Sequence, residues 1–176
     1  PRAELLALAA ELGSDVPFCL VGGTAIGSGR GQHLTPVLGR GVYHWVVALA
    51  DAGLSTPQVY GELDRMRRGR EVAAPAVPGR LMNALRAGDP RAVGAALSND
   101  LQVAALTLCP TVAATLDAGD AAGALGALVS GSGPTVVFLA LDEDHAGDVG
   151  AALVDAGVCR LVQHVTGPVA GARVVG

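Results

Sequence analysis

The sequence predicts an α+β sandwich in which a mostly antiparallel sheet carries helices on one face. One observation behind this class is the order of elements from residue 43 onward: a strand, successive helices, two strands joined by a glycine-rich turn, a helix and a strand. The other is composition, since 51% of the 176 residues are hydrophobic and 16% are charged. Such a chain buries a substantial core and lacks the composition of a disordered segment. Because only 3% of residues are aromatic, alanine, valine and leucine must fill this core.

The chain opens inside a helical pattern. Alanines and leucines recur at helical spacing over residues 3–12, and Gly13 follows where a helix commonly ends. No initiator methionine precedes this pattern, so we expect the chain to be cut from a longer protein.

Short elements follow the first helix. Ser14 and Asp15 form a cap-like pair before the apolar residues 16–20. Glycines then punctuate short strand-like pieces over residues 22–37. The glycine-containing stretch 39–41 is the predicted boundary between two lobes.

The second lobe begins with a predicted buried strand at residues 43–50, an apolar run with β-branched content. A helix opens at Ser55, with a proline in its first turn. Further helices are predicted at residues 81–87, 89–106 and 110–119, and the pair Asp89-Pro90 caps the second of them. Within this series, Asn99 and Asp100 fit a helix C-terminal cap or a turn.

The remaining elements surround a glycine-rich turn at residues 130–134. Extended segments are predicted at residues 125–129, 135–141, 161–165 and 173–175. Between them, acidic residues 142–144 open a helix that Gly157 ends, since carboxylates favour the N-terminal end of the helix dipole.

The charge pattern excludes two classes of partner. The formal net charge is −4, whereas nucleic acids and anionic membrane surfaces select a clustered basic face. The only basic cluster is formed by Arg65, Arg67, Arg68 and Arg70, in a stretch predicted to be a solvated loop. No apolar run reaches the roughly 20 residues of a membrane span. We therefore predict no nucleic-acid and no membrane partner.

The cysteines indicate a reducing compartment. Cys19, Cys109 and Cys159 lie far apart among apolar residues, without the spacing of a disulfide framework or a zinc site. We therefore interpret them as small buried hydrophobic residues, predict no metal site, and expect a cytoplasmic protein.

The strongest local signal for chemistry is VSGSGPTVVF at residues 129–138. Gly131 and Gly133 flank Ser132 between two strands, which leaves backbone N–H groups free of Cβ atoms and able to approach phosphate oxygens. The alternative is a glycine-rich hairpin with no ligand. The motif lacks the GK[ST] ending of a Walker A loop, and a strand follows it where a dinucleotide-binding fingerprint has a helix.

Asp15 is the candidate for proton chemistry. A carboxylate beside glycine at the start of a helix can accept or orient the proton of a substrate hydroxyl. Its alternative role is that of an ordinary N-cap, although Ser14 could serve as the cap equally well.

Thr56, Pro57 and Tyr60 form the candidate for recognition of a planar ring. An aromatic side chain in the first turns of a helix, beside a loop, can stack on a base. The alternative is a half-buried tyrosine that belongs to the core.

Five stretches in series resemble the GHMP kinase family of small-molecule kinases. They are LAAELGSDVPFCLVGGTAIGSGRGQHLTPV (8–37), LSTPQVYGELD (54–64), LSNDLQVAA (97–105), VSGSGPTVVF (129–138) and TGPVAGARVV (166–175). Together they cover almost the whole chain. The resemblance implies that residues 1–40 end the family's N-terminal domain and that residues 41–176 form its C-terminal domain, a ferredoxin-like sandwich.

The resemblance also implies an activity. The branch of the GHMP kinase family that carries the STPQVY stretch transfers the γ-phosphate of ATP, with Mg²⁺, to the 2-hydroxyl of a diphosphocytidyl-linked methylerythritol. This reaction is a step of non-mevalonate isoprenoid synthesis. Asp15 matches the catalytic aspartate, and residues 131–133 match the motif near the ATP phosphates and substrate. Tyr60 matches the aromatic position that stacks on cytosine, with Thr56 and Pro57 beside it. The implied partner is a small cytidine diphosphate sugar alcohol, and the implied assembly is a monomer or weak homodimer.

Two family features are missing from the sequence. It has no PxxxGLGGGSADAA-type phosphate loop and no lysine at all, since all 12 basic residues are arginine. Phosphoryl transfer depends on positioning and charge neutralisation, so we expect this chain alone to be inactive. Two alternatives stay open: another GHMP kinase, for homoserine or the mevalonate pathway, and a ferredoxin-like binding module.

Overall fold

The computed structural model describes residues 2–51 and 53–173. Its strands are β1 (Ala25–Ser28), β2 (His33–Pro36), β3 (Tyr43–Leu49), β4 (Gly126–Val129), β5 (Val136–Ala140) and β6 (Leu161–Gly167). Its helices are α1 (Arg2–Leu12), α2 (Val16–Val21), α3 (Thr56–Arg67), α4 (Gly79–Ala87), α5 (Pro90–Gly94), α6 (Gln102–Leu108), α7 (Thr111–Ala121) and α8 (Glu143–Asp155).

The main sheet has the strand order β4-β5-β3-β6, and every neighbouring pair is antiparallel. At its centre, Val46 of β3 lies opposite Phe138 of β5 on one side and His164 of β6 on the other. The predicted antiparallel sheet is therefore confirmed, and β4 and β6 are its edge strands.

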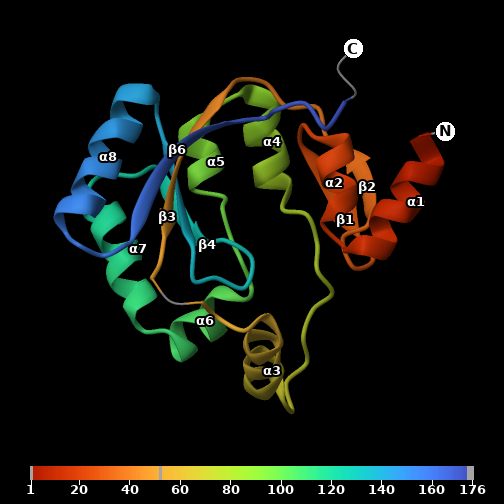
Figure 1. Ribbon diagram of the computed structural model, residues 1–176, viewed down its shortest axis with the longest axis horizontal. Coiled ribbons are helices and arrows are strands. Elements are labelled where there is room, and N and C mark those ends of the chain that lie inside the picture. Colours follow the sequence, from red (N-terminus) through yellow and green to blue (C-terminus); the bar gives the residue numbers. More distant parts are fainter. Residues whose placement is uncertain (1, 52, 174–176) are drawn as a thin grey trace.

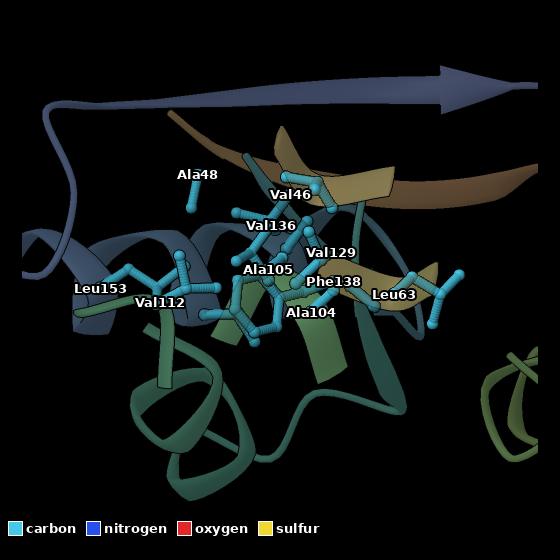
Figure 2. Packing of buried hydrophobic residues seen from close by; sticks show 14 residues of the cluster. Val46, Ala48, Leu63, Ala104, Ala105, Val112, Val129, Val136, Phe138 and Leu153 are labelled. Carbon is cyan, nitrogen blue, oxygen red and sulfur yellow. The ribbon is translucent and has the colours of Figure 1, made fainter. Parts of the chain in front are cut away.

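One face of this sheet carries the larger hydrophobic core. Figure 2 shows Val46, Val136 and Phe138 grouped with side chains of the surrounding helices, and all three are fully buried. Both α7 and α8 pack on the strands, while α6 contacts β4 and α3. The Phe138 ring lies so close to Gly119 of α7 that any Cβ atom there would overlap it. Burial of one such ring contributes roughly 1.5–3 kcal/mol to stability.

The second face of the sheet also carries helices, so the prediction of helices on one face only is wrong. Tyr43 and Leu139 pack there against Ala84 of α4 and Val93 of α5, with Trp45 beside them. The central strands are apolar on both faces, as expected for strands covered by helices on each side. In Figure 1, α4 and α5 accordingly lie across the sheet from α7 and α8.

The single helix predicted at residues 89–106 is two short helices, α5 and α6, separated by a loop. The backbone of Gly94 lies directly against that of Leu125, where a Cβ atom would clash. The Asn99 side chain then accepts a hydrogen bond from Leu101 N–H at 2.9 Å, a local turn that competes with helix. The contact with Leu125 joins distant parts of the sequence, so helical periodicity could not reveal it.

The smaller lobe contains α1, α2 and the β1-β2 hairpin, which forms a sheet of its own. In Figure 1 it lies beside α4, at the opposite end of the molecule from α8. Its helices and short strands agree with the predictions for residues 3–37. The predicted lobe boundary at residues 39–41 falls in the segment between β2 and β3.

The C-terminal segment returns to the smaller lobe. Ala170 forms an isolated antiparallel bridge with Gly22, whose φ of 63° favours glycine. Ala172 N–H donates to the Cys19 carbonyl oxygen at 2.7 Å. Of the extended segment predicted at residues 173–175, Arg173 belongs to no strand, and Val174 and Val175 lie outside the described residues.

Candidate functional site

The first residue of α3 meets the glycine turn between β4 and β5. Thr56 Oγ1 lies 2.8 Å from Ser132 Oγ, although the two residues are 76 positions apart in the sequence. This hydrogen bond joins two motifs that the sequence marks separately, one for ring recognition and one for phosphate.

The turn itself requires glycine. Gly131 and Gly133 have φ values of 58° and 78°, which residues with a Cβ atom rarely adopt. A Cβ atom on Gly133 would also lie 2.7 Å from Val129 Cγ1. The turn is closed by Ser130 N–H, which donates to the Thr135 carbonyl oxygen at 2.8 Å.

Two donors of the turn remain available to a ligand. Among the described residues, the backbone N–H groups of Gly131 and Ser132 donate to no protein acceptor, whereas Gly133 N–H donates to the Ser130 carbonyl oxygen at 2.9 Å. Successive backbone N–H groups in a turn attract anions.

The start of α3 adds to this local positive potential. Ser55 occupies its N-cap position without a side-chain hydrogen bond to the helix, and Pro57 stands in the first turn. The uncapped N-terminus of a 12-residue helix carries partial positive charge, which favours a nearby anion.

Tyr60 presents its ring to solvent. It lies one helical turn after Thr56, on the same side of α3, and is 53% exposed, whereas the adjacent Val59 is fully buried in the core. Tyr60 is therefore not one of the residues of the larger hydrophobic core, because Val59 and Leu63 supply the packing face of this helix.

Asp15 stands apart from these contacts. It occupies the N-cap position of α2, but its carboxylate makes no cap hydrogen bond, and the residue is exposed. Among the described residues it contacts neither Thr56 nor Ser132 through a hydrogen bond or ion pair. The Asp15 side chain therefore does not act as an ordinary N-cap of α2.

The smaller lobe nevertheless approaches the base of the turn. A cavity of about 480 Å³ is lined by Ile26 and Gly27 of the hairpin, by Leu81 of α4, and by Ser98 and Leu128. The last two directly precede Asn99 and Val129, so the hairpin that follows Asp15 lies near the end of β4.

Sequence reasoning did not predict that Asn99 and Gln102 hold the glycine turn, although it placed Asn99 at a helix cap or a turn. Asn99 Nδ2 donates to the carbonyl oxygens of Val129 and Gly131, at 2.7 Å each, and Gln102 Oε1 accepts from Val129 N–H at 2.9 Å. Asn99 therefore lies in a turn and not in a helix cap. Both residues fall within the LSNDLQVAA stretch, which was the available signal.

The basic cluster is not a simple solvated loop. Arg65 and Arg67 belong to the last turn of α3, and Arg67 Nη2 lies 2.7 Å from Asp100 Oδ2. Arg65 donates to Glu62 at 2.7 Å, and this hydrogen bond lowers the pKa of Glu62 below its usual value. These ion pairs form because the helix places acid and base three residues apart and brings its end beside the loop of Asp100.

The cysteines are free thiols, of which Cys109 and Cys159 are half-buried. Cys19 is exposed, so its interpretation as a buried hydrophobic residue is wrong, because it lies on the outer side of a short helix. Burial raises the pKa of the Cys159 thiol.

Residues 2–51 and 53–173 contain no group of three or more histidine, cysteine, aspartate or glutamate side chains able to hold a metal ion. In the same part of the chain, no helix combines the length and apolar character of a membrane crossing.

The sequence matches known proteins over nearly its whole length. Residues 81–159 match the family described as GHMP kinases C terminal. The chain is 55% identical to 4-diphosphocytidyl-2-C-methyl-D-erythritol kinase of Streptomyces avermitilis, over 99% of this chain and 59% of the relative. It is 56% identical to the protein of the same name from Nocardia farcinica, over 99% of this chain and 57% of the relative. The chain thus spans little more than half the length of these relatives.

Solved structures show the same similarity. A crystal structure of 4-(cytidine 5'-diphospho)-2C-methyl-D-erythritol kinase matches with a TM-score of 0.74 and 31% identity, over 92% of this chain and 56% of that one. Homoserine kinase from Cytophaga hutchinsonii matches with a TM-score of 0.66 and 20% identity, over 88% of this chain and 51% of that one, which shows a shared fold.

Proposed function

We propose that this chain is the C-terminal part of an ATP-dependent kinase of the GHMP family, because residues 81–159 match the family described as GHMP kinases C terminal and the similar proteins are kinases by name. The proposed reaction is phosphorylation of the 2-hydroxyl of 4-diphosphocytidyl-2-C-methyl-D-erythritol, a step of non-mevalonate isoprenoid synthesis. The relatives that carry this name support the substrate.

The observation that carries the proposal is the contact between Thr56 and Ser132. It joins the helix that bears the exposed Tyr60 ring to a turn with two unengaged N–H groups. A cytidine diphosphate has the matching chemistry, a planar base next to phosphate oxygens, and it could engage both features at once.

Each candidate residue has a distinct proposed role. Asp15 accepts or orients the proton of the 2-hydroxyl as that oxygen attacks the γ-phosphate. Gly131 and Ser132 stabilise phosphate charge through their N–H groups, and Gly133 permits the turn. Tyr60 stacks on the cytosine ring, and Thr56 with Pro57 positions that end of the substrate.

We propose that further residues of the longer kinase bind ATP, and that Mg²⁺ arrives with the ATP phosphates, which together with water supply most of its ligands. We assign no residue of this chain to the metal. This chain without those residues is expected to be inactive.

The proposed domain division places residues 1–40 at the end of the N-terminal kinase domain and residues 41–176 in the C-terminal domain. The separate sheets of the two lobes support it. We further propose a cytoplasmic enzyme, a monomer or weak homodimer, with neither nucleic-acid nor membrane partners, in accord with the net charge of −4.

A substrate panel tests this function. The whole kinase, incubated with ATP labelled in its γ-phosphate, should transfer label to 4-diphosphocytidyl-2-C-methyl-D-erythritol and not to homoserine or mevalonate. Cytidine diphosphate should compete with the substrate. Transfer to homoserine or mevalonate without competition by cytidine diphosphate would identify a different GHMP kinase and overturn the proposed substrate.

A further inference from the structure

The Asn99 side chain is fully used by backbone groups. Its Nδ2 group donates to the carbonyl oxygens of Val129 and Gly131, at 2.7 Å each, and its Oδ1 atom accepts from Leu101 N–H at 2.9 Å. Two donor bonds therefore reach across to the glycine turn, while the acceptor bond holds the side chain on its own loop.

Gln102 completes this arrangement at the edge of the sheet. β4 is an edge strand, and its last residue, Val129, is fully buried. Gln102 Oε1 accepts from Val129 N–H at 2.9 Å, while Asn99 binds the Val129 carbonyl oxygen. The two side chains thus bond this residue as a neighbouring strand would, which avoids the cost of unpaired buried backbone groups.

The loop that carries Asn99 is also tied to α3. Asp100, the next residue, accepts a hydrogen bond from Arg67 of α3 at 2.7 Å. The first residue of the same helix, Thr56, contacts Ser132. The turn is therefore held from two directions by elements that are themselves connected.

The hydrogen bonds of Asn99 and Gln102 to Val129 and Gly131 form a clamp on the turn. Because a peptide group is planar, this clamp also sets the direction of the N–H groups on the ligand side of the turn. The C=O of one residue and the N–H of the next point in opposite directions in a trans peptide. Asn99 holds the Val129 carbonyl oxygen, and the Ser130 N–H on the opposite side donates to Thr135 at 2.8 Å. By the same geometry, the hydrogen bond to Gly131 directs the Ser132 N–H away from Asn99.

The clamp also removes a repulsive group. A carbonyl oxygen that faced a bound phosphate would repel it, whereas an N–H group attracts it. Because Asn99 engages the Gly131 carbonyl oxygen, the turn is fixed with that oxygen on the protein side. The Ser132 N–H has no acceptor among the described residues.

We propose that Asn99 is a positioning residue that sets the orientation of the Gly131–Ser132 peptide, so that Ser132 N–H donates to a phosphate oxygen of the ligand. Gln102 supports it by holding the end of β4. The ligand part of this inference rests on the proposed kinase function, whereas the clamp itself rests on the hydrogen bonds alone.

Asn99→Asp separates the two hydrogen bonds that the Asn99 side chain donates from the one that it accepts. The variant keeps an acceptor for Leu101 N–H but replaces the donor with a charged oxygen that faces two carbonyl groups. Asn83→Asp is the matched control, because Asn83 is exposed on α4 and its only side-chain hydrogen bond within residues 2–51 and 53–173 is accepted from Arg86, at 3.4 Å. Should Asn99→Asp not fold, Asn99→Ala removes the donor without adding charge.

The first readout is amide hydrogen exchange and ¹⁵N-resolved chemical shifts of the whole kinase. We expect Ser130 N–H to exchange about fivefold to tenfold faster in the Asn99 variant, the effect of one net hydrogen bond, with shifted Gly131 and Ser132 amides. The Asn83 control should leave all three unchanged. Equal behaviour of the two variants at these amides would overturn the clamp.

The second readout is phosphate transfer by the whole kinase. Loss of one hydrogen bond to a charged phosphate should raise the KM for the phosphate-bearing ligand roughly tenfold or more, with a smaller change in kcat. Unchanged KM with altered turn amides would overturn the ligand role of Ser132 N–H. If the wild-type kinase transfers no phosphate, the proposed function fails, while the exchange data still decide the clamp.

Discussion

The glycine turn and Asp15 are organised in opposite ways. The turn and the end of β4 before it are bonded by Asn99, Gln102 and Thr56, side chains from two other parts of the chain. The Asp15 carboxylate is exposed and accepts no hydrogen bond from the described residues.

This contrast separates two kinds of functional residue. The geometry of the turn is built into the fold, so changes there should alter stability and ligand affinity together. Asp15 contributes no such contact, so its replacement should alter chemistry while leaving the fold intact.

The largest effect is expected from Asp15→Asn. Loss of the group that accepts or orients the hydroxyl proton should lower kcat of the whole kinase by about 10²- to 10⁴-fold. The thermal midpoint should stay unchanged, because no cap hydrogen bond is lost. Asp117→Asn, at an exposed position on α7, is the matched control for charge. A fall in thermal midpoint that accounts for the lost activity would contradict the contrast.

Gly133→Ala should have the next largest effect. A Cβ atom there meets Val129 Cγ1 at 2.7 Å and forces a residue other than glycine to a φ of 78°. We expect a loss of about 2–4 kcal/mol in the free energy of unfolding, measured by denaturant titration.

Gly147→Ala on α8 is the control for this substitution. A Cβ atom at Gly147 meets nothing within 4 Å, so alanine should leave stability unchanged or raise it by up to about 1 kcal/mol. Similar stability changes in the two variants would show that the turn has no special requirement for glycine.

Tyr60→Ala tests whether an exposed residue of α3 contributes to ligand affinity without contributing to stability. Removal of an exposed stacking residue should raise the KM for the cytidine-bearing substrate about tenfold, with little change in stability, because Tyr60 is 53% exposed. Tyr60→Phe keeps the ring and should retain most of the affinity. An unchanged KM in the alanine variant would remove Tyr60 from the proposed site.

The smallest effect is expected at the hydroxyl pair. Thr56→Val and Ser132→Ala each remove the same 2.8 Å hydrogen bond, and each should cost about 1 kcal/mol in the free energy of unfolding. The double variant should cost little more than either single one. Additive losses in this double-mutant cycle would mean that the two hydroxyl groups do not interact.

The sequence predicted those parts of the fold that depend on local signals. Asp89 caps α5 by accepting from Arg91 N–H at 2.9 Å, as the Asp-Pro pair indicates, and the apolar run of β3 forms the centre of the sheet. The break before α6 and the helices on the second face depend on contacts between distant residues. Periodicity carries no information about such contacts.

The same limit applies to the candidate site. The glycines at residues 131 and 133 indicated the turn, and the STPQVY stretch indicated Tyr60, because both patterns are visible in the sequence. The Thr56–Ser132 hydrogen bond and the clamp of Asn99 join residues 76 and about 30 positions apart. Only the folded chain brings these groups together.

The most direct test of the central claim is a titration of the ¹⁵N-labelled whole kinase with cytidine 5'-diphosphate. We predict that the amide signals of Gly131, Ser132 and Tyr60 shift with a common dissociation constant, while those of α8 stay in place. No shift at Gly131 and Ser132 under saturating ligand, or equal shifts throughout α8, would contradict a cytidine diphosphate site formed by the glycine turn and α3.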